Sequence, residues 1–310
     1  GGLGRALGGV VERAERLGQR GADPVDYPYH YIAPSNTGVP SGHDLNNDGT
    51  VGGGDDAYGF GLFPGQYGMV VYSKYPIDTA KVRTFQLQKW QDMPGNRMPT
   101  DWYSPAEQAD LRLSSKSHWD LPIRIGTRTV HLLASHPTPP TFDGPEDRNG
   151  RRNADEIRLW ADYVSGGHDA RWIRDDEGRR GGLPRGASFV IAGDQNADPD
   201  DGDSTDDAIH QLLDHPRVNT SVTPTSRGAV EASEQQGGIN DEHVGNSAQD
   251  TADFAEPPGN IRADYVLPSK GLKIEDSRVF WPTSADPLAR LTGSYPFPTS
   301  DNRLVWVNVK

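Results

Sequence analysis

The chain reads Ala187-Ser188-Phe189-Val190-Ile191-Ala192 and continues directly into Gly193-Asp194-Gln195-Asn196-Ala197-Asp198-Pro199. The first run is apolar, has the length of a strand and is rich in β-branched and aromatic residues, so it predicts a buried strand. Side chains at positions i and i+2 point to the same side of a strand, so we expect Asp194 and Asn196 to converge on one atom. A carboxylate beside an amide suits the activation of a water next to a phosphate oxygen or a metal. The competing interpretation is an ordinary turn, which Asp and Asn also favour.

The 310-residue sequence carries a formal net charge of −13 and contains no cysteine. The absence of cysteine excludes disulfides, thiolate zinc sites and cysteine nucleophiles. The acidic balance suits a soluble protein that holds divalent cations. It disfavours nucleic acid as a partner without excluding it, because non-specific binding there needs clustered cations. We find no signal peptide and no apolar run approaching the roughly 18 residues of a membrane span.

The order of apolar segments predicts an α/β protein. Interleaved strands, few helices and no interdomain linker indicate a single domain over 1–310. We expect loop-rich insertions near 27–68 and 223–258, the second polar and mobile. Periodicity predicts helices at 10–17 and 153–164 and strands at 69–73, 121–125, 129–135, 187–192, 264–267, 279–281 and 304–309.

Several of these strands end in polar motifs of the same layout. In chain order the motifs are Ser135-His136-Pro137, Gly193-Asp194-Gln195-Asn196, Arg262-Ala263-Asp264-Tyr265 and Ser300-Asp301-Asn302-Arg303. Together with Ser73-Lys74-Tyr75-Pro76-Ile77, this set resembles the endonuclease/exonuclease/phosphatase superfamily, which includes DNase I-like nucleases, inositol polyphosphate phosphatases and neutral sphingomyelinases. The resemblance runs from about 67 to 309. Residues 27–68 and the Trp-rich loops resemble a secreted bacterial branch of that superfamily.

The resemblance implies a fold and a reaction. The fold is a four-layer α/β/β/α sandwich, in which helices flank two mixed β-sheets and the site lies at one edge. The reaction is metal-assisted hydrolysis of a phosphoester by in-line attack of an activated water. The implied cofactor is a divalent metal, Mg²⁺ or Mn²⁺ with Ca²⁺ as a further option, which would neutralise phosphate oxygens.

The resemblance also implies roles for single residues. Asp194 would orient or deprotonate the attacking water, and Asn196 would hold that water or a phosphate oxygen. His136 would contact the phosphate or protonate the leaving group. Asp301 matches an acid near the metal, so it and Asp194 are the implied metal ligands. Asp264 matches the acid that orients a histidine of the family.

The sequence departs from the family pattern in two places. Where the family has Ser-Asp-His, this chain has Ser300-Asp301-Asn302. Asparagine can donate a hydrogen bond to phosphate but carries no proton to transfer near neutral pH. The second departure is at the amino end, where we find no strand that ends in the metal-binding glutamate of the family. Glu12 and Glu15 lie on an expected helix and are poor substitutes.

Three further residues are candidate substrate ligands. Lys116 and His118 lie in Ser114-Ser115-Lys116-Ser117-His118-Trp119-Asp120, which gathers a cation, an imidazole and hydroxyls before a strand. Arg152 follows the strand that carries His136. These residues either supply donors to a substrate phosphate or form an exposed strand lead-in and a charged helix start.

A separate segment has the spacing of a calcium loop. Asp44, Asn46 and Asp48 occupy its positions 1, 3 and 5, Gly49 permits a sharp turn, and Asp55 stands at position 12. The segment resembles dockerin-type loops, although no exit helix follows it. A solvated turn rich in Asx and Gly is the other interpretation.

Two hypotheses of function follow. The first is a metal-dependent phosphoesterase acting on a small or exposed phosphomono- or phosphodiester, impaired by Asn302 and by the lack of an amino-terminal glutamate. The second is a catalytically inactive relative that binds calcium or a phosphorylated ligand. The calcium loop favours an extracellular location, and the sequence leaves the oligomeric state open.

Overall fold

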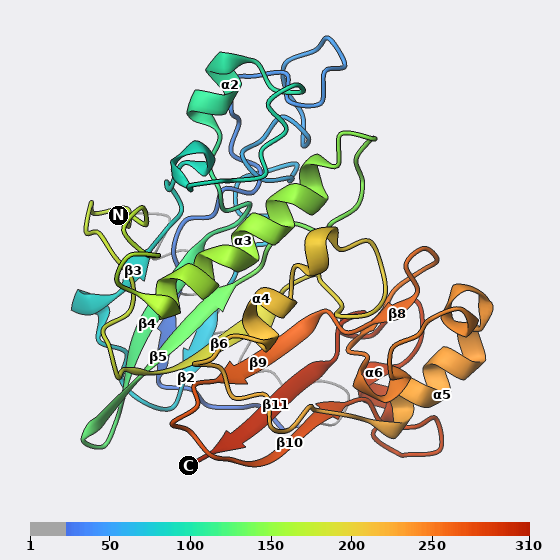
Figure 1. The fold of residues 1–310 in the computed structure, drawn as a ribbon. Coiled ribbons are helices and arrows are strands. Elements are labelled where there is room, and N and C mark those ends of the chain that lie inside the picture. Colours follow the sequence, from blue (N-terminus) through green and yellow to red (C-terminus); the bar gives the residue numbers. More distant parts are fainter. Residues whose placement is uncertain (1–22) are drawn as a thin grey trace.

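The computed structural model describes residues 23–310 (Figure 1). Its main sheet has the strand order β3–β4–β5–β6–β9, formed by Arg83–Thr84, His118–Ile125, Arg128–Ser135, Ser188–Asp194 and Asp264–Pro268. β4 and β5 contain the predicted strands 121–125 and 129–135 and form an antiparallel hairpin, β5 and β6 are parallel, and the remaining pairs are antiparallel. The sheet is therefore mixed, and the predicted α/β class is confirmed.

The other strands within residues 23–310 form two-stranded pairs. These are β1 with β2 (Tyr29–Tyr31, Val71–Ser73), β7 with β8 (Ala252–Asp253, Asn260–Ile261) and β10 with β11 (Ile274–Phe280, Leu304–Val309). β11 lies beside β9 of the main sheet (Figure 1). Within the described residues, β10 and β11 are thus the part of a second sheet that accompanies the first.

One long helix covers the main sheet. α3 spans Arg148–Ser165, includes the predicted 153–164 helix and lies across β4, β5 and β6 (Figure 1). The shorter helices are α2 (Pro105–Asp110), α4 (His210–Leu213), α5 (Arg227–Gln236) and α6 (Ala289–Thr292). Single 3-10 turns occur at Thr79–Lys81, Trp90–Asp92, Thr205–Asp207, Gly238–Asp241 and Ser247–Gln249. The helix expected at 10–17 lies outside the described residues.

The expectation of a loop-rich segment at 223–258 is wrong for 227–236, which forms α5. The side chain of Ser226 accepts a hydrogen bond from the amide of Ala229 at 3.0 Å and so caps the helix. Ala229 is fully buried against Val279 and Trp281. A local cap and a tertiary contact therefore order a stretch whose polar composition indicates a loop. Residues 27–68 contain only β1 as regular structure.

Apolar side chains cover both faces of the main sheet. On the α3 side, the core contains Leu133, Phe189, Ile191, Tyr265 and Leu267 with Ile157, Trp160 and Val164 of the helix. On the other face it contains Val71, Ile77, Val82, Trp119, Leu121 and Ala134. Successive strand residues alternate between the two clusters, as the period of a β-strand requires.

A buried carboxylate ties α3 to the preceding loops. Asp155 is completely buried and accepts hydrogen bonds from Trp90 Nε1 at 2.7 Å, from the Arg97 amide at 2.7 Å and from Arg97 Nη1 at 2.8 Å. Arg97 also contacts Asp206 at 2.9 Å, but the side chain of Asp206 is 65% exposed. The same guanidinium therefore joins one buried and one exposed acid.

We expect Asp155→Ala to lower the free energy of unfolding by about 3–5 kcal/mol, because it leaves a buried indole N–H and a guanidinium without their acceptor. Asp206→Ala is the matched control and should change it by less than about 1 kcal/mol. Urea unfolding of both variants measures the two values. Equal losses would contradict the assignment of the stabilising contact to Asp155.

Candidate active site

The carboxyl ends of β5 and β6 open at the same edge of the sheet. The two strands are parallel, with Ala134 opposite Ala192, so the residues after Ser135 and Gly193 leave the sheet side by side. Gly193 has φ +145°, and a Cβ atom at this position would lie 1.9 Å from the carbonyl oxygen of Ser135. Only glycine permits this approach of the two strand ends.

His136 and Asp194 meet at this edge. Nε2 of His136 lies 3.5 Å from Oδ2 of Asp194, and their side chains are 29% and 15% exposed. Burial, with a smaller contribution from the Lys116 cation, holds the pKa of His136 well below its ordinary value. Burial and the Asp301 carboxylate raise the pKa of Asp194 to about 6, against hydrogen bonding from the Asn196 amide and attraction by Lys116. Near neutral pH the pair is a neutral imidazole beside a largely ionised carboxylate.

The side chains of Asn196 and Lys116 donate hydrogen bonds to the same acceptor, the carbonyl oxygen of Pro137. Asn196 has φ +50°, and its amide donates to Asp194 Oδ1 at 2.8 Å. Its side-chain nitrogen donates to the carbonyl oxygen of Pro137 at 3.0 Å, and Lys116 Nζ donates to the same oxygen at 3.1 Å. Burial lowers the pKa of Lys116 to about 8, although Glu156 and Asp194 favour its charged form. The structure thus places Lys116 inside the site.

Asp264 stands directly opposite Asp194 in the register of β6 and β9. Its Oδ2 accepts a hydrogen bond from Thr251 Oγ1 at 3.0 Å. Burial, followed by repulsion from Asp194, raises the pKa of Asp264 well above its ordinary value. Asp264 therefore binds a proton more readily than an ordinary aspartate does. The described residue that bonds to its side chain is a threonine and not the histidine of the family pattern.

Asp301 and Asn302 reach the site from the segment before β11. The Asp253 amide donates to the carbonyl oxygen of Asp301 at 2.9 Å, so this segment runs beside β7. The Asp301 carboxylate raises the pKa values of Asp194 and Asp264, which places three acids within electrostatic reach of one another. Asn302 Nδ2 lies 3.4 Å from Asp301 Oδ1, whereas Asn302 Oδ1 is buried without a hydrogen-bond donor.

Two polar residues of α3 support the site, and the sequence analysis missed both. Glu156 is completely buried and accepts hydrogen bonds from the Ser115 amide at 2.6 Å, Ser115 Oγ at 3.0 Å and the Thr138 amide at 2.8 Å. Asn153 Nδ2 donates to the carbonyl oxygens of Thr138 and Gln195 at 2.8 and 2.9 Å. The available signal was their position on the apolar stripe of the helix, where a polar residue requires a buried partner.

The structure does not place His118 at the substrate. His118 is completely buried, with Nδ1 2.7 Å from Ser114 Oγ and Nε2 2.9 Å from the carbonyl oxygen of Glu156. Burial lowers its pKa to about 3. The prediction that His118 binds substrate is wrong, because both ring nitrogens are engaged inside the core.

The prediction for Arg152 is also wrong. Its Nε donates to the carbonyl oxygen of Leu113 at 2.9 Å, and its Nη2 donates to those of Tyr58 and Arg112 at 2.6 and 2.8 Å. The guanidinium therefore satisfies main-chain carbonyls where two loops meet α3, and burial lowers its pKa. Arg152 positions these loops and does not point into the site.

The candidate calcium loop is a turn held by its own side chains. The Asp44 carboxylate accepts from the amides of Asp48 and Gly49 at 3.1 and 2.8 Å, and Asn46 Oδ1 accepts from the Asp48 amide at 3.1 Å. Asp55 is exposed, whereas its buried neighbour Asp56 accepts from the amides of Leu45 and Gly52, each at 2.7 Å. This geometry serves either interpretation of the segment.

The sheet edge offers donor atoms that suit the divalent metal implied by the family resemblance. Asp194 and Asp301 offer the hard oxygen ligands that Mg²⁺ and Mn²⁺ prefer, and their mutual repulsion favours a cation between them. Glu12 and Glu15 lie outside the described residues. Within residues 23–310, no three or more His, Asp or Glu side chains are gathered as a complete set of metal ligands.

Known proteins were compared with the chain. No curated protein matches it. Among solved structures, it is similar to an endonuclease/exonuclease/phosphatase from Beutenbergia cavernae, with a TM-score of 0.48 and 14% identity over 92% of this chain and 54% of that one. It therefore spans about half the length of that structure. It is also similar to an endonuclease/exonuclease/phosphatase family protein from Leptotrichia buccalis (TM-score 0.44, 13% identity, 93% and 73% coverage). A third is beta toxin from Staphylococcus aureus (TM-score 0.43, 14% identity, 92% and 79% coverage).

The family comparison covers nearly the whole sequence. The model of the endonuclease/exonuclease/phosphatase family matches residues 9–301. This range includes the ends of β5 and β6, the start of β9 and Asp301, which are the elements that build the site. The chain belongs to the endonuclease/exonuclease/phosphatase family.

Proposed function

We propose that this protein hydrolyses phosphoesters with the help of a divalent metal. Membership of the endonuclease/exonuclease/phosphatase family supports metal-dependent phosphoester hydrolysis in general. The observation that carries the proposal for this chain is the pair formed by His136 and Asp194, 3.5 Å apart at the ends of two parallel strands. An imidazole and a carboxylate at this separation can both contact one small substrate group.

Each side chain of the site has a separate task in this proposal. Asp194 accepts the proton of the attacking water, or orients that water, as an ionised carboxylate whose pKa of about 6 suits a base near neutral pH. Asn196, fixed by its bonds to Asp194 and Pro137, holds the water or a phosphate oxygen. His136 contacts the phosphate as a neutral imidazole.

Lys116 supplies a positive charge close to Asp194 and His136. Lys116 is almost completely buried, at 6% exposure, and interacts electrostatically with Asp194 and His136. A fixed cation in a dry environment stabilises negative charge that develops on the phosphate during the reaction. Asp194 and Asp301 would hold Mg²⁺ or Mn²⁺, or alternatively Ca²⁺, and the metal supplies neutralisation of the phosphate oxygens.

The proposed substrate is a small or exposed phosphomono- or phosphodiester. The formal net charge of −13 opposes duplex DNA, which needs a basic surface for non-specific binding. No helix between Asp23 and Lys310 combines the length and the hydropathy of a membrane span. We propose an extracellular location, because millimolar calcium there suits the Asp44, Asn46, Asp48 and Asp55 segment as a structural Ca²⁺ loop.

The second candidate is an inactive relative that binds calcium or a phosphorylated ligand. Asn302 supports it, because an amide transfers no proton near neutral pH. Its buried oxygen also has no donor among the described residues. Hydrolysis of a simple phosphoester therefore separates the two candidates.

We expect His136→Ala and Asp194→Ala each to lower kcat for bis-p-nitrophenyl phosphate or p-nitrophenyl phosphate by about 10²–10⁴-fold, the usual effect of removing a catalytic acid or base. The assay contains Mg²⁺, Mn²⁺ or Ca²⁺, and His168→Ala, whose side chain is 81% exposed, serves as the control. Turnover that persists in both active-site variants would contradict the proposed site.

We expect Asn302→His to raise kcat by about 10-fold or more, since it introduces a group that can hold and transfer a proton beside Asp301. Asn302→Ala is the comparison, because it removes the amide without adding an imidazole. A similar gain in both variants would argue against proton transfer. Silence of the parent chain and of Asn302→His, with folding verified by circular dichroism, would favour the inactive relative.

Loss of the Lys116 charge should limit activity at high pH. The pKa of Lys116 is lowered to about 8, so its charge is present below that pH and lost above it. We expect turnover to fall as pH rises through about 8, and Lys116→Met to be about 10-fold slower at pH 7 with this fall absent. Lys81→Met, at a side chain that is 75% exposed, should retain the parent pH profile. An unchanged profile in Lys116→Met would contradict the electrostatic role.

A further inference from the structure

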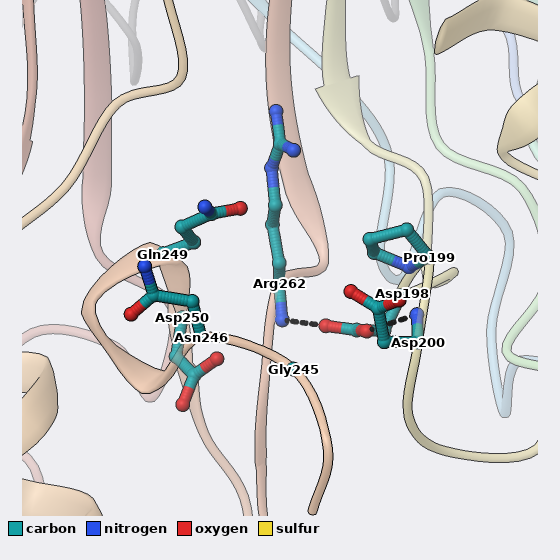
Figure 2. Close-up of a pocket in the computed structure, with 8 residues that line it drawn as sticks. All are labelled: Asp198, Pro199, Asp200, Gly245, Asn246, Gln249, Asp250 and Arg262. Atoms are coloured by element: carbon teal, nitrogen blue, oxygen red, sulfur yellow. Dashed lines mark hydrogen bonds between the residues drawn. The ribbon is translucent and has the colours of Figure 1, made fainter. Parts of the chain in front are cut away.

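A small acidic pocket lies beside the active site and takes no part in the proposed chemistry. We use the term acidic pocket for the space of about 10 Å³ lined by Asp198, Pro199, Asp200, Gly245, Asn246, Gln249, Asp250 and Arg262 (Figure 2). A space of this size holds one water molecule or one small ion. Two chain segments form its walls, 198–200 from the loop after β6 and 245–250 from the segment before β7.

Two acids of the loop after β6, Asp198 and Asp201, are already committed to main-chain amides. Asp198 Oδ1 accepts from the amides of Asp200 and Asp201 at 2.8 Å each, and its Oδ2 accepts from the Arg262 amide at 2.6 Å. Asp201 accepts from the amides of Val244 and Gly245 at 2.9 and 3.0 Å. These bonds fix the shape of the pocket.

Asp250 differs from these acids. It is only 7% exposed, and its carboxylate has no hydrogen bond or ion pair within the described residues, although it lines the pocket. The guanidinium of Arg262 extends away from the carboxylates (Figure 2) and lies 4.4 Å from the centre of the Tyr265 ring. Burial, followed by repulsion from Asp198 and Asp201, raises the pKa of Asp250 to about 8. A buried carboxylate without a partner is strongly unfavourable unless a proton or a cation neutralises it.

We propose that the acidic pocket binds a Ca²⁺ ion with Asp250 as its principal ligand. The lining donors are carboxylate and amide oxygens, which are the ligands of a hard cation. The carboxylates of Asp200 and Asp250, the amide oxygen of Gln249 and bound water form a mixed set, which Ca²⁺ accepts because its coordination is irregular and flexible. Mg²⁺ demands near-octahedral geometry and is disfavoured here.

A cation at this position would join two segments that support the active site. Asp198 follows Asn196 by two residues, and Asp250 directly precedes Thr251, whose hydroxyl bonds to Asp264. The ion would therefore brace the catalytic loop without contacting the substrate. This inference does not depend on the proposed phosphoesterase activity.

The test measures the difference in Tm between about 10 mM CaCl₂ and EGTA at about pH 8. All variants carry Asp48→Asn and Asp301→Asn, which remove the responses of the separate 44–55 loop and of the Asp194 and Asp301 pair. We expect calcium to raise the Tm of this parent by about 2 °C or more and to leave Asp250→Asn unchanged. Because each variant is compared with itself, an altered basal stability does not affect the readout.

A second variant guards against failure of Asp250→Asn to fold. Asp200 is exposed and lines the same pocket, so Asp200→Asn should fold and weaken the calcium response several-fold. A calcium response that survives in Asp250→Asn would overturn the proposal. Absence of any calcium response in the parent would also overturn the proposal, and a higher Tm of Asp250→Asn in EGTA would then indicate that a proton neutralises Asp250. An equal response to MgCl₂ would reject the choice of calcium.

Discussion

The parallel pairing of β5 with β6 is the constraint on which the site depends. It brings the carboxyl ends of the two strands, Ser135 of β5 and Asp194 of β6, to one edge of the sheet. A side chain at Gly193 would collide with the carbonyl oxygen of Ser135, so this glycine sets how closely the strands approach. His136 and Asp194 then leave the sheet next to each other. Their chemistry follows from a backbone fit that no other residue at 193 would permit.

A buried polar layer under the sheet edge supports this arrangement. Glu156 bonds to the main chain at both Ser115 and Thr138, and so holds the loop that carries Lys116 against the one that follows His136. Burial raises the pKa of Glu156 and lowers that of Lys116, while each charge favours the charged form of the other. Such a layer contributes little net stability, since desolvation of two charges offsets their attraction. The layer instead fixes the position of the Lys116 ammonium group, which is held by its hydrogen bond to the carbonyl oxygen of Pro137.

The local elements could be predicted from the sequence, and the partners of buried polar groups could not. Period-two apolar runs predicted β5 and β6, and the stripe of Ile157, Trp160 and Val164 predicted most of α3. These predictions succeed because the spacing of apolar residues follows the buried face of each element. His118 looked like a substrate ligand because it stands beside Lys116, yet the two side chains have different surroundings: Lys116 reaches the site and His118 is enclosed in the core. Sequence spacing carries no information on which way a loop turns. The α5 helix was missed for a related reason, since its order comes from packing on Trp281.

The carboxylates at this end of the sheet lie close enough to repel one another. The Asp301 carboxylate raises the pKa values of Asp194 and Asp264, Asp194 also raises that of Asp264, and Asp198 and Asp201 raise that of Asp250. A folded chain can accept such crowding in two ways, by binding protons or by binding cations. Protons lower the charge but remove the base that hydrolysis needs, whereas a cation lowers the repulsion and leaves the carboxylate ionised. For Asp264, opposite Asp194 in the sheet, burial and repulsion from Asp194 favour the binding of a proton. Asp194 and Asp301 lie at the sheet edge, where a bound cation would reduce the repulsion between their carboxylates and would also serve catalysis.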